Sequence, residues 1–368
     1  MKRIDWKLAT LVIVLSLFGI IMIYSASSYS ALKDYGDAFF YVKKQVLAFF
    51  LGIIVMFALI FVNIEKIKRF AVPVYAVSML LLALVFVPGL GVESYGAKRW
   101  LDLGFFTLQP SEYSKFGLVI FLAAFMSSRD ITKLKNLALA LACGLAMSAL
   151  IIVEPNMSIT VCVGAVLIIM LFVGGMKTGH LAALALPAAA AVPVMIIAEP
   201  YRLKRLAAFI DPWKNPLGEG YQLIQSYYAL GSGGFFGVGL FNSRQKYLFL
   251  PFAESDFILS VIGEELGYAG CLLLFALFAA LIYLGYAAAV RADTPFKCYL
   301  AAGITSVIAV QTLVNAAVVS GAIPPTGLPL PFISAGGSSL VAFMAACGLL
   351  LNVSARGATH KQEKNHSM

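Results

Sequence analysis

The sequence predicts an all-α, polytopic integral membrane protein with about ten transmembrane helices. Its 368 residues are 61% hydrophobic and only 12% charged, whereas a soluble domain is about 45–50% apolar and about 25% charged. The mean hydropathy is +0.90. Apolar runs of about twenty residues, each long enough to cross the bilayer core, recur along the whole length. These observations exclude a soluble enzyme carried on a single anchor.

Ten apolar segments are expected to span the membrane. The first is followed by further spans and lacks a small-residue cleavage site, so we interpret it as a retained helix. The eighth would be about 51 Å long as one helix. Either its first turns stand above the bilayer core, or it breaks near Gly263, Gly267 and Gly270. The spans are expected at residues 8–24, 43–62, 70–87, 113–127, 137–153, 157–174, 180–198, 257–290, 299–320 and 332–353.

The distribution of basic residues orients these spans. An even number of spans places both termini on one side, and the positive-inside rule selects the cytoplasm. With cytoplasmic termini, the inside segments hold fifteen Lys and Arg residues against five in the short outside segments. The long loop at about 199–256, between spans 7 and 8, is then extracytoplasmic. We expect one transmembrane domain at 1–356 and a disordered cytoplasmic tail at 357–368.

Cysteine, histidine and net charge exclude several kinds of site. The five cysteines lie in or beside apolar runs without a Cys-x-x-Cys pair, so we interpret them as small core residues. The three histidines are scattered, which excludes a histidine metal site and a histidine-dependent triad. The net charge of +9 follows from the cytoplasmic basic residues and does not indicate a nucleic acid partner.

Four carboxylates stand in the apolar stretch LFLPFAESDFILSVIGEELG at 248–267. Asp256 directly precedes the eighth span at the outer interface, where partial desolvation would raise its pKa and suit a general base. Glu254 is a candidate for helping with a metal ion or the acceptor. Glu264 and Glu265 lie two turns deeper, and we expect them to bond to other helices.

Other ionisable residues lie near the outer ends of spans. Such residues are costly at membrane depth and are functional hypotheses by default. Glu112 and Lys115, in LQPSEYSKF, are three residues apart on a helix and can pair with each other. Glu154 lies at the outer end of the fifth span. A structural network and the binding of a charged headgroup both remain open for these residues.

The outer loop before the fourth span contains GAKRWLDLG at 96–104. Trp100 could be an interfacial belt residue, and Lys98 and Arg99 could simply be solvated. Together they also suit an anionic, ring-bearing substrate, with cations for phosphate and an indole for sugar or lipid.

The long outer loop begins with an amphipathic pattern. Basic residues at Arg202, Lys204 and Arg205 precede an apolar stretch, which is typical of a helix lying on the membrane. The glycines of GYQLIQSYYALGSGGFFGVG at 220–239 do not match G-x-G-x-x-G, so dinucleotide binding is rejected. Tight turns or close helix packing explain them better.

The segment NSRQKYLFLP follows at 242–251. Arg244 and Lys246, with Ser243 and Gln245, are candidate substrate contacts just before the acidic stretch. Cations and carboxylates therefore converge at the outer interface. That mixture suits a substrate with a diphosphate to hold and a hydroxyl to activate.

Long ordered motifs give the chain a specific resemblance over nearly its whole length. They are GAKRWLDLG, LQPSEYSKF, RLAAFIDPWKNPLGEGYQLIQSYYALGSGG, NSRQKYLFLP, SDFILSVIGEELG and TGLPLPFISAGGSSL. The chain resembles the SEDS family (shape, elongation, division and sporulation), and NSRQK favours its FtsW/SpoVE branch over the RodA branch.

The resemblance implies a peptidoglycan glycosyltransferase. Such a protein polymerises lipid II, an undecaprenyl-diphosphate disaccharide-pentapeptide, on the outer face of the cytoplasmic membrane, here at the division septum or in sporulation. It implies the essential Asp at Asp256, the loop Trp at Trp100, and the motif residues Glu112 and Lys115. It also implies help from Mg²⁺ or Mn²⁺ and work with a class B penicillin-binding protein and other divisome membrane proteins.

The chain departs from the family pattern at two positions. Many members have EPD or QPD where this chain has Glu154-Pro155-Asn156, and Asn156 cannot form an ion pair with Lys115. That bridge is therefore expected to be neutral or to shift to Glu112. Many members also have Tyr where this chain has Ala335.

The mechanism that we expect uses Asp256 to deprotonate the GlcNAc 4-hydroxyl of an incoming lipid II. That oxygen attacks the anomeric carbon of the growing strand with inversion, and the diphosphate leaves without protonation, so a second carboxylic acid is not required. A divalent ion, or Arg202, Arg205, Arg244 and Lys246, would offset the diphosphate charge. A lipid II flippase and a non-catalytic divisome scaffold are the alternatives.

Overall fold

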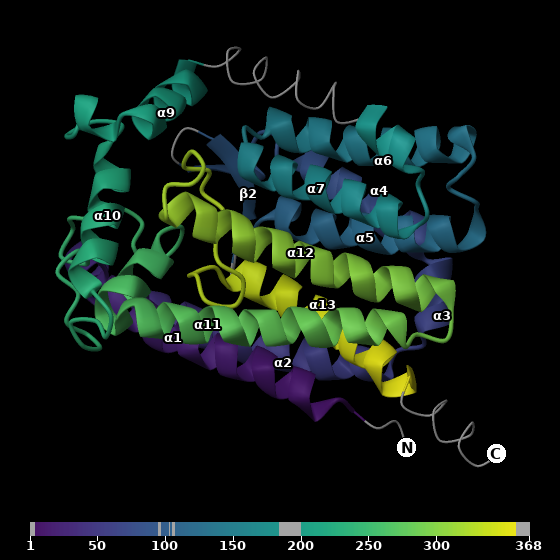
Figure 1. The fold of residues 1–368 in the computed structure, drawn as a ribbon, viewed down its shortest axis with the longest axis horizontal. Coiled ribbons are helices and arrows are strands. Elements are labelled where there is room, and N and C mark those ends of the chain that lie inside the picture. The colour runs from purple at the N-terminus through teal and green to yellow at the C-terminus, as the bar shows by residue number, and fades with distance from the viewer. Residues whose placement is uncertain (1–3, 95–96, 103, 105–106, 184–199, 358–368) are drawn as a thin grey trace.

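The computed structural model describes residues 4–94, 97–102, 104, 107–183 and 200–357. Most of these residues lie in helices that run roughly parallel in one bundle (Figure 1). The main helices are α1 (Trp6–Tyr35), α2 (Phe40–Phe61), α3 (Ile64–Arg69), α4 (Ala71–Leu84), α5 (Pro110–Ser128), α6 (Leu134–Val153), α7 (Met157–Val173), α11 (Ile258–Val290), α12 (Pro295–Val319) and α13 (Gly337–Gly357).

Nine of the ten predicted spans coincide with helices of the bundle. The remaining prediction, a span at 180–198, falls largely outside the described residues. Within the described part, six helices are long and apolar enough to cross a membrane, namely α1, α2, α6, α11, α12 and α13, and α4 and α7 are shorter apolar helices. The polytopic, mainly helical fold is therefore confirmed, while the count of ten stays a prediction.

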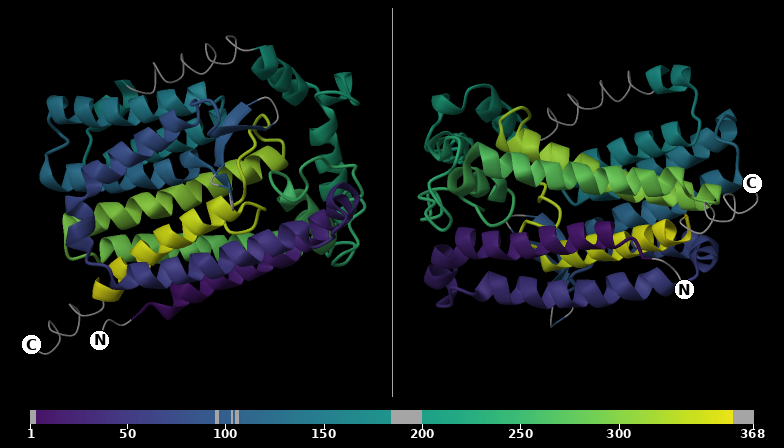
Figure 2. Two further views of the ribbon diagram at one scale, coloured as in Figure 1. Left: turned by 180° about the vertical axis from the view of Figure 1, so that it is seen from behind. Right: turned by 60° about the horizontal axis from the view of Figure 1, so that its bottom comes forward.

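The centre of the bundle is α12, which packs against α5, α7, α11 and α13. It lies between a group formed by α4 to α7 and a group formed by α1, α2, α11 and α13 (Figures 1 and 2). One face of α12 carries Gln311 and Asn315, which are buried polar residues one helical turn apart. These side chains matter for the site described below.

The start of α1 and the end of α13 lie at the same end of the bundle (Figures 1 and 2). This agrees with the prediction that both termini lie on one side of the membrane. The predicted extracytoplasmic loop contains α9 (Pro200–Ile210), a short 3₁₀ turn, η1 (Pro212–Lys214), and α10 (Tyr221–Gly233). These elements cover the opposite end of the bundle, where α11 begins and α12 ends (Figure 1).

A small antiparallel sheet, absent from the sequence prediction, lies before α5. It consists of β1 (Gly91–Ser94), β2 (Ala97–Asp102) and β3 (Thr107–Leu108), in the order β1-β2-β3. Strands this short, with charged residues in β2, carry too little hydrophobic alternation to be recognised. The segment GAKRWLDLG, predicted as a loop, therefore presents Arg99 and Trp100 from a strand.

The eighth span breaks at Gly267, as one of the two alternatives predicted. Gly267 has φ 68° and ψ −168° inside α11, a backbone conformation that is essentially restricted to glycine. The amides of Tyr268 and Ala269 donate to the carbonyl groups of Gly234 and Phe235, at 2.9 and 3.0 Å. The glycine-rich loop after α10 thus supplies the acceptors that the broken helix lacks.

The same loop also donates to the other side of the break. The amides of Val238 and Gly239 bond to the carbonyl groups of Glu264 and Glu265, at 2.9 and 3.0 Å. A Cβ on Gly237 would lie 2.1 Å from the Glu265 carbonyl oxygen. The glycines that fail the dinucleotide pattern are therefore explained by close backbone approach, which confirms the structural interpretation.

Candidate active site at the covered end of the bundle

Asp256 lies in the turn that leads into α11, at the end of the bundle that α9 and α10 cover. Its backbone carbonyl accepts a hydrogen bond of 3.0 Å from Asn315 Nδ2. The carbonyl of Ser255 accepts from Ser334 Oγ at 2.7 Å, and that of Glu254 from the Ala335 amide at 2.8 Å. The turn is therefore fixed by α12 and by the segment before α13.

The carboxyl group of Asp256 is partly buried and lies within electrostatic range of two arginines. Burial raises its pKa to about 6, while the guanidinium groups of Arg205 and Arg99 act to lower it. Gly327 lies so close that a Cβ on it would be 3.1 Å from Asp256 Oδ2. An acid with this pKa can accept a proton near neutral pH, which is the requirement for a general base.

The two arginines are held by backbone oxygens from different parts of the chain. In β2, Arg99 donates through Nε to the carbonyl of Glu154 at 3.2 Å and through Nη2 to that of Pro155 at 2.6 Å. From α9, Arg205 donates through Nη1 to the carbonyl of Pro325 at 3.0 Å. The fold thus brings β2, α9 and the loop before α13 together around Asp256.

Glu254 and Glu154 are two further acidic groups in this region. Burial raises the pKa of Glu254, and the negative charges of Asp256 and Asp34 act in the same direction. Burial also raises the pKa of Glu154 to about 8, against the opposing charge of Arg99. The region therefore combines carboxyl groups of unequal acidity with guanidinium groups.

Glu112 and Lys115 form a closed network inside the bundle. Lys115 Nζ lies 2.7 Å from Glu112 Oε2 and donates to Gln311 Oε1 at 2.6 Å. Ser339 Oγ donates to the same oxygen of Glu112 at 2.7 Å. Both charged side chains are at most 1% exposed. Their predicted pairing is confirmed, and their burial favours the structural alternative over contact with a substrate.

The departure at Asn156 has the consequence predicted for it. Lys115 pairs with Glu112, so the ion pair has shifted to that residue. Asn156 instead caps the start of α7, where its Oδ1 accepts from the Ile159 amide at 3.3 Å. A short amide side chain is well suited to this capping position.

The interior network reaches the turn of Asp256 through α12. Gln311 accepts from Lys115 and donates through Nε2 to the Pro329 carbonyl at 2.9 Å. One turn later, Asn315 donates to the carbonyl groups of both Asp256 and Leu328, at 3.0 and 2.7 Å. The buried ion pair therefore supports the loop that lies against Asp256.

The segment NSRQK is held by the two acids deeper in α11. Glu264 accepts from Ser243 Oγ and from the amides of Arg244 and Gln245, and Glu265 accepts from the Phe241 and Ser243 amides. Lys246 Nζ lies 3.3 Å from Glu265 Oε1, and Ser25 of α1 donates to the same oxygen at 2.6 Å. As expected, both acids are buried away from solvent. The expectation that they bond to other helices is confirmed for Glu265, through Ser25 of α1, whereas Glu264 bonds to the loop segment at 243–245.

These contacts separate the predicted substrate residues of NSRQK. Ser243 is 0% and Lys246 6% exposed, so their contacts favour a role in holding the loop. The side chain of Arg244 is exposed, and Gln245 is partly exposed. Of this group, Arg244 has the position best suited to meeting an anionic ligand.

Three predicted contacts lie in elements near Asp256. Trp100 is partly buried in β2, opposite Val92 of β1. Lys98 belongs to β2 and Arg202 to α9, but their side chains lie outside the part of the chain that the structure describes.

Asp256 and Glu254 are the two acids at this end that were predicted as candidates for holding a divalent ion. Within the described residues, no group of three or more His, Cys, Asp or Glu side chains gathers as a metal cage. Mg²⁺, however, is usually held by one or two carboxylates together with substrate phosphates. Asp256 and Glu254, two residues apart and close enough to influence each other's charge, fit that pattern.

Several residues of the site were missed by the sequence analysis. Asn315, Gln311 and Ser339 are uncharged, and they stand out only when the helices are packed together. Gly327 lies in TGLPLPF, the first part of the motif TGLPLPFISAGGSSL, and Pro325 directly precedes this segment. Its proline-rich composition is the sequence signal of an irregular loop, and in the structure Gly327 has φ 76°.

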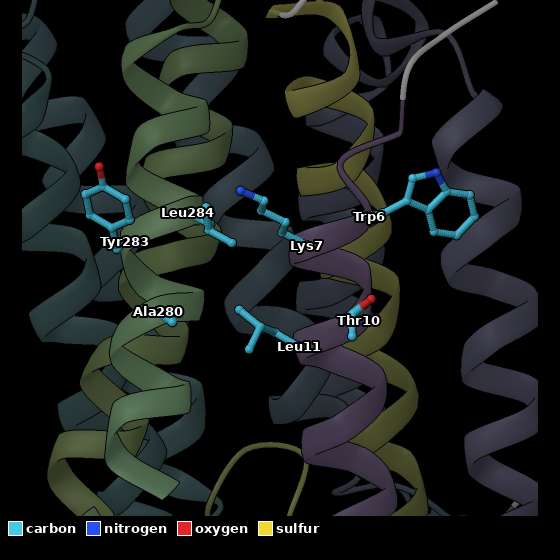
Figure 3. A pocket seen from close by; sticks show the side chains of 7 residues that line it. All are labelled: Trp6, Lys7, Thr10, Leu11, Ala280, Tyr283 and Leu284. Atoms are coloured by element: carbon cyan, nitrogen blue, oxygen red, sulfur yellow. The ribbon is translucent and has the colours of Figure 1, made fainter. Parts of the chain in front are cut away.

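A groove of about 520 Å³ lies between α1 and α11 (Figure 3). Its α11 residues lie toward the end of that helix that is farther from Asp256. Its lining is largely aliphatic and aromatic. It is formed by Trp6, Lys7, Thr10, Leu11, Ala280, Tyr283 and Leu284.

Comparison with known proteins identifies the family. The family model FTSW_RODA_SPOVE, described as "Cell cycle protein", matches residues 5–359. The chain belongs to this FtsW/RodA/SpoVE family. It is 39% identical to stage V sporulation protein E of Bacillus subtilis over 355 residues, which cover 95% of this chain and 96% of the relative. It is also 39% identical to a probable peptidoglycan glycosyltransferase FtsW of Geobacter sp. over 364 residues, covering 97% and 99%.

Solved structures of the FtsW/RodA/SpoVE family share the fold. A chain from a peptidoglycan synthase complex that coordinates polymerization and crosslinking superposes with a TM-score of 0.80 at 30% identity, covering 97% of this chain and 99% of that one. The crystal structure of Thermus thermophilus RodA gives a TM-score of 0.72 at 28% identity, covering 96% and 97%. The predicted family and membrane fold are therefore confirmed.

Proposed function

We propose that this protein is a peptidoglycan glycosyltransferase that polymerises lipid II into β-1,4 glycan strands. The observation that carries the proposal is Asp256, a partly buried acid flanked by Arg99 and Arg205 at the covered end of the bundle. Membership of a family with relatives named peptidoglycan glycosyltransferase FtsW supports the same activity. A lipid-linked sugar would present its headgroup at this end of the bundle.

In the proposed reaction, Asp256 takes the proton of the acceptor 4-hydroxyl as its oxygen attacks the anomeric carbon of the donor. The carbon–oxygen bond to the diphosphate breaks, and the diphosphate leaves with the bonding electron pair. Arg99 and Arg205 lie where they can stabilise the charge that develops on this leaving group. Trp100, on the same strand as Arg99, would contact a sugar ring or the lipid in this proposal.

A divalent cation, Mg²⁺ or Mn²⁺, would be held by Asp256 and Glu254. When bound, it would supply positive charge to the phosphate oxygens. The pKa of Glu254 is raised by burial. A bound cation would oppose this effect and favour the ionised form of Glu254, because a cation stabilises a carboxylate.

The partner that we propose is a class B penicillin-binding protein, which would cross-link the new strands. The similarity to a chain of a peptidoglycan synthase complex supports this assignment. We place the protein in the cytoplasmic membrane at the division septum, or at the corresponding site in sporulation. Other divisome membrane proteins would share that location.

A lipid II flippase is the second candidate, because it would also hold charged groups near a lipid headgroup. Transporters place such groups near the bilayer midplane, often in broken helices. The break at Gly267 and the pair formed by Glu112 and Lys115 are features of that kind. Here, however, the break is sealed by the loop after α10 and the ion pair is enclosed, so neither lines an open path.

The decisive test supplies labelled lipid II in detergent to the purified protein, with and without its penicillin-binding partner. Detergent removes the two compartments, so transport cannot produce a signal. We expect glycan polymer when the partner is present. Unchanged lipid II under those conditions would favour the flippase or the scaffold.

A further inference from the structure

Glu154 is an acid at the site that the proposed reaction does not use. It follows the last residue of α6, and its side chain is 0% exposed. Neither carboxyl oxygen has a hydrogen-bond partner among the described residues. An ionised carboxylate in such a position would be costly, so the neutral acid is the favoured form.

The arrangement around Glu154 connects it to Asp256. Arg99 donates to the backbone carbonyls of Glu154 and Pro155, and not to the carboxyl group. The Arg99 guanidinium is nevertheless close enough to act on the charges of both Glu154 and Asp256. The charge of Arg99 therefore interacts with two acids, Glu154 and Asp256, and the proposed reaction needs only Asp256 as a base.

A second contact ties the same turn to the other side of the site. Ser158, in the first turn of α7, donates through Oγ to the carbonyl of Thr326. The next residue, Gly327, lies against the carboxyl group of Asp256. The turn at 154–156 is thus held between β2 and the loop before α13, and any charge placed there acts on the region where a diphosphate would bind.

We propose that Glu154 is a positioning residue for Arg99: its backbone carbonyl helps to hold the guanidinium, its neutral side chain leaves the charge of Arg99 available to an anionic ligand, and its ionised side chain weakens the binding of a diphosphate. This inference rests on the proposed function only in its choice of an anionic, lipid-linked ligand. Glu154 makes no contact with the reacting atoms in this proposal, and it acts through Arg99.

The pH range follows from the electrostatics of the turn. Burial raises the pKa of Glu154 to about 8, and Arg99 is the charged group that opposes this shift. Below that pH the carboxyl is neutral, and above it a negative charge develops beside Arg99. The positive potential that reaches Asp256 and an incoming phosphate then falls.

The test measures the dissociation constant of undecaprenyl diphosphate at pH 7 and pH 9, which requires no turnover. For the wild type we expect binding about tenfold weaker at pH 9, because a like charge has appeared beside the anion site. Glu154→Gln keeps a neutral side chain of the same size and should remove most of this pH dependence. Glu219→Gln, which alters an exposed acid of the long loop, should retain the wild-type dependence.

Titration of the headgroup itself affects all three proteins alike, so the comparison isolates Glu154. Infrared difference spectra provide a direct second readout. A band of a protonated carboxyl group should disappear between pH 7 and pH 9 in the wild type and in Glu219→Gln, and should be absent from Glu154→Gln.

The proposal is overturned if Glu154→Gln shows the same pH dependence of binding as the wild type, or if the infrared band is not lost in the wild type. A merely structural role would lower the stability of Glu154→Gln and leave its pH dependence of binding the same as that of the wild type. Failure of the wild type to polymerise lipid II would refute the proposed function, while both of these measurements would still decide the role of Glu154.

Discussion

Replacing Lys115 by Met tests whether the buried ion pair supports the fold or contacts the substrate. Methionine has a similar length and no charge, so the change removes the partner of Glu112 without opening a large cavity. Glu112 keeps the hydrogen bond from Ser339, but its charge is then uncompensated at 0% exposure. Gln311 also loses the donor that faces its Oε1.

The expected cost can be estimated from buried pairs in other proteins. Removing one partner of such a pair typically costs about 3–5 kcal/mol, because the other charge stays buried. For a chain of this length, the usual entropy of unfolding per residue converts that cost to a fall of roughly 4–7 °C in Tm. Substituting both residues, as Glu112→Gln with Lys115→Met, should recover much of the loss.

Thermal unfolding of the purified variants in detergent measures this prediction. Asp37→Asn is the matched control, because it breaks an exposed pair in which Lys43 is 69% exposed, and it should leave Tm nearly unchanged. If Lys115→Met left Tm unchanged but abolished binding of undecaprenyl diphosphate, the structural role argued here would be refuted. A double variant less stable than Lys115→Met would contradict the electrostatic explanation.

Three further predictions concern α11 and the turn before it. Gly267→Ala should lower the free energy of unfolding by at least about 2 kcal/mol, since the new Cβ would lie 2.3 Å from the Gly237 amide nitrogen. The control Gly164→Ala in α7, which has open space around it, should be tolerated. Equal Tm values for the two variants would refute this prediction. Glu265→Leu removes the acceptors of the Phe241 and Ser243 amides, so hydrogen exchange at these amides should accelerate. Unchanged protection would show that Glu265 does not hold this loop. Asp256→Asn should be more stable than the wild type at pH 7. Folding raises the pKa of Asp256 from 3.8 to about 6, so the wild-type protein loses stability as pH rises through that interval. A difference in Tm between the two proteins that stays constant between about pH 4 and about pH 6 would be inconsistent with that shift.

The sequence was most informative where hydrophobic runs were long. Nine of the ten predicted spans correspond to helices, because about twenty apolar residues leave few alternatives to a membrane helix. The break in α11 could be predicted only as one of two options. Its position depends on the loop after α10, which supplies the hydrogen bonds that make Gly267 the favourable place to interrupt the helix.

The sequence was less informative about which polar residues meet. Glu112, Lys115, Ser243 and Lys246 were candidates for substrate contact by residue type, yet their side chains are buried against other protein groups. Burial of this kind is decided by helix packing. Asp256 could be singled out because its place, just before an apolar run, already implied partial desolvation.

The environment of Asp256 also depends on segments distant in the sequence. Arg99, Arg205 and Asn315 come from a strand, a loop helix and α12, and no spacing pattern relates them. The sequence indicated cations near the outer interface, but it could not select which of them lie beside the acid. Selecting Arg99 and Arg205 required the three-dimensional arrangement.

Polymerisation by Asp256→Ala tests the central claim most directly. The measurement compares glycan polymer formed from labelled lipid II by wild type and variant, each with its penicillin-binding partner and each shown to be folded by thermal unfolding. We predict polymer from the wild type and none above background from Asp256→Ala. Near-normal polymer from the folded variant would contradict the assignment of Asp256 as the catalytic base.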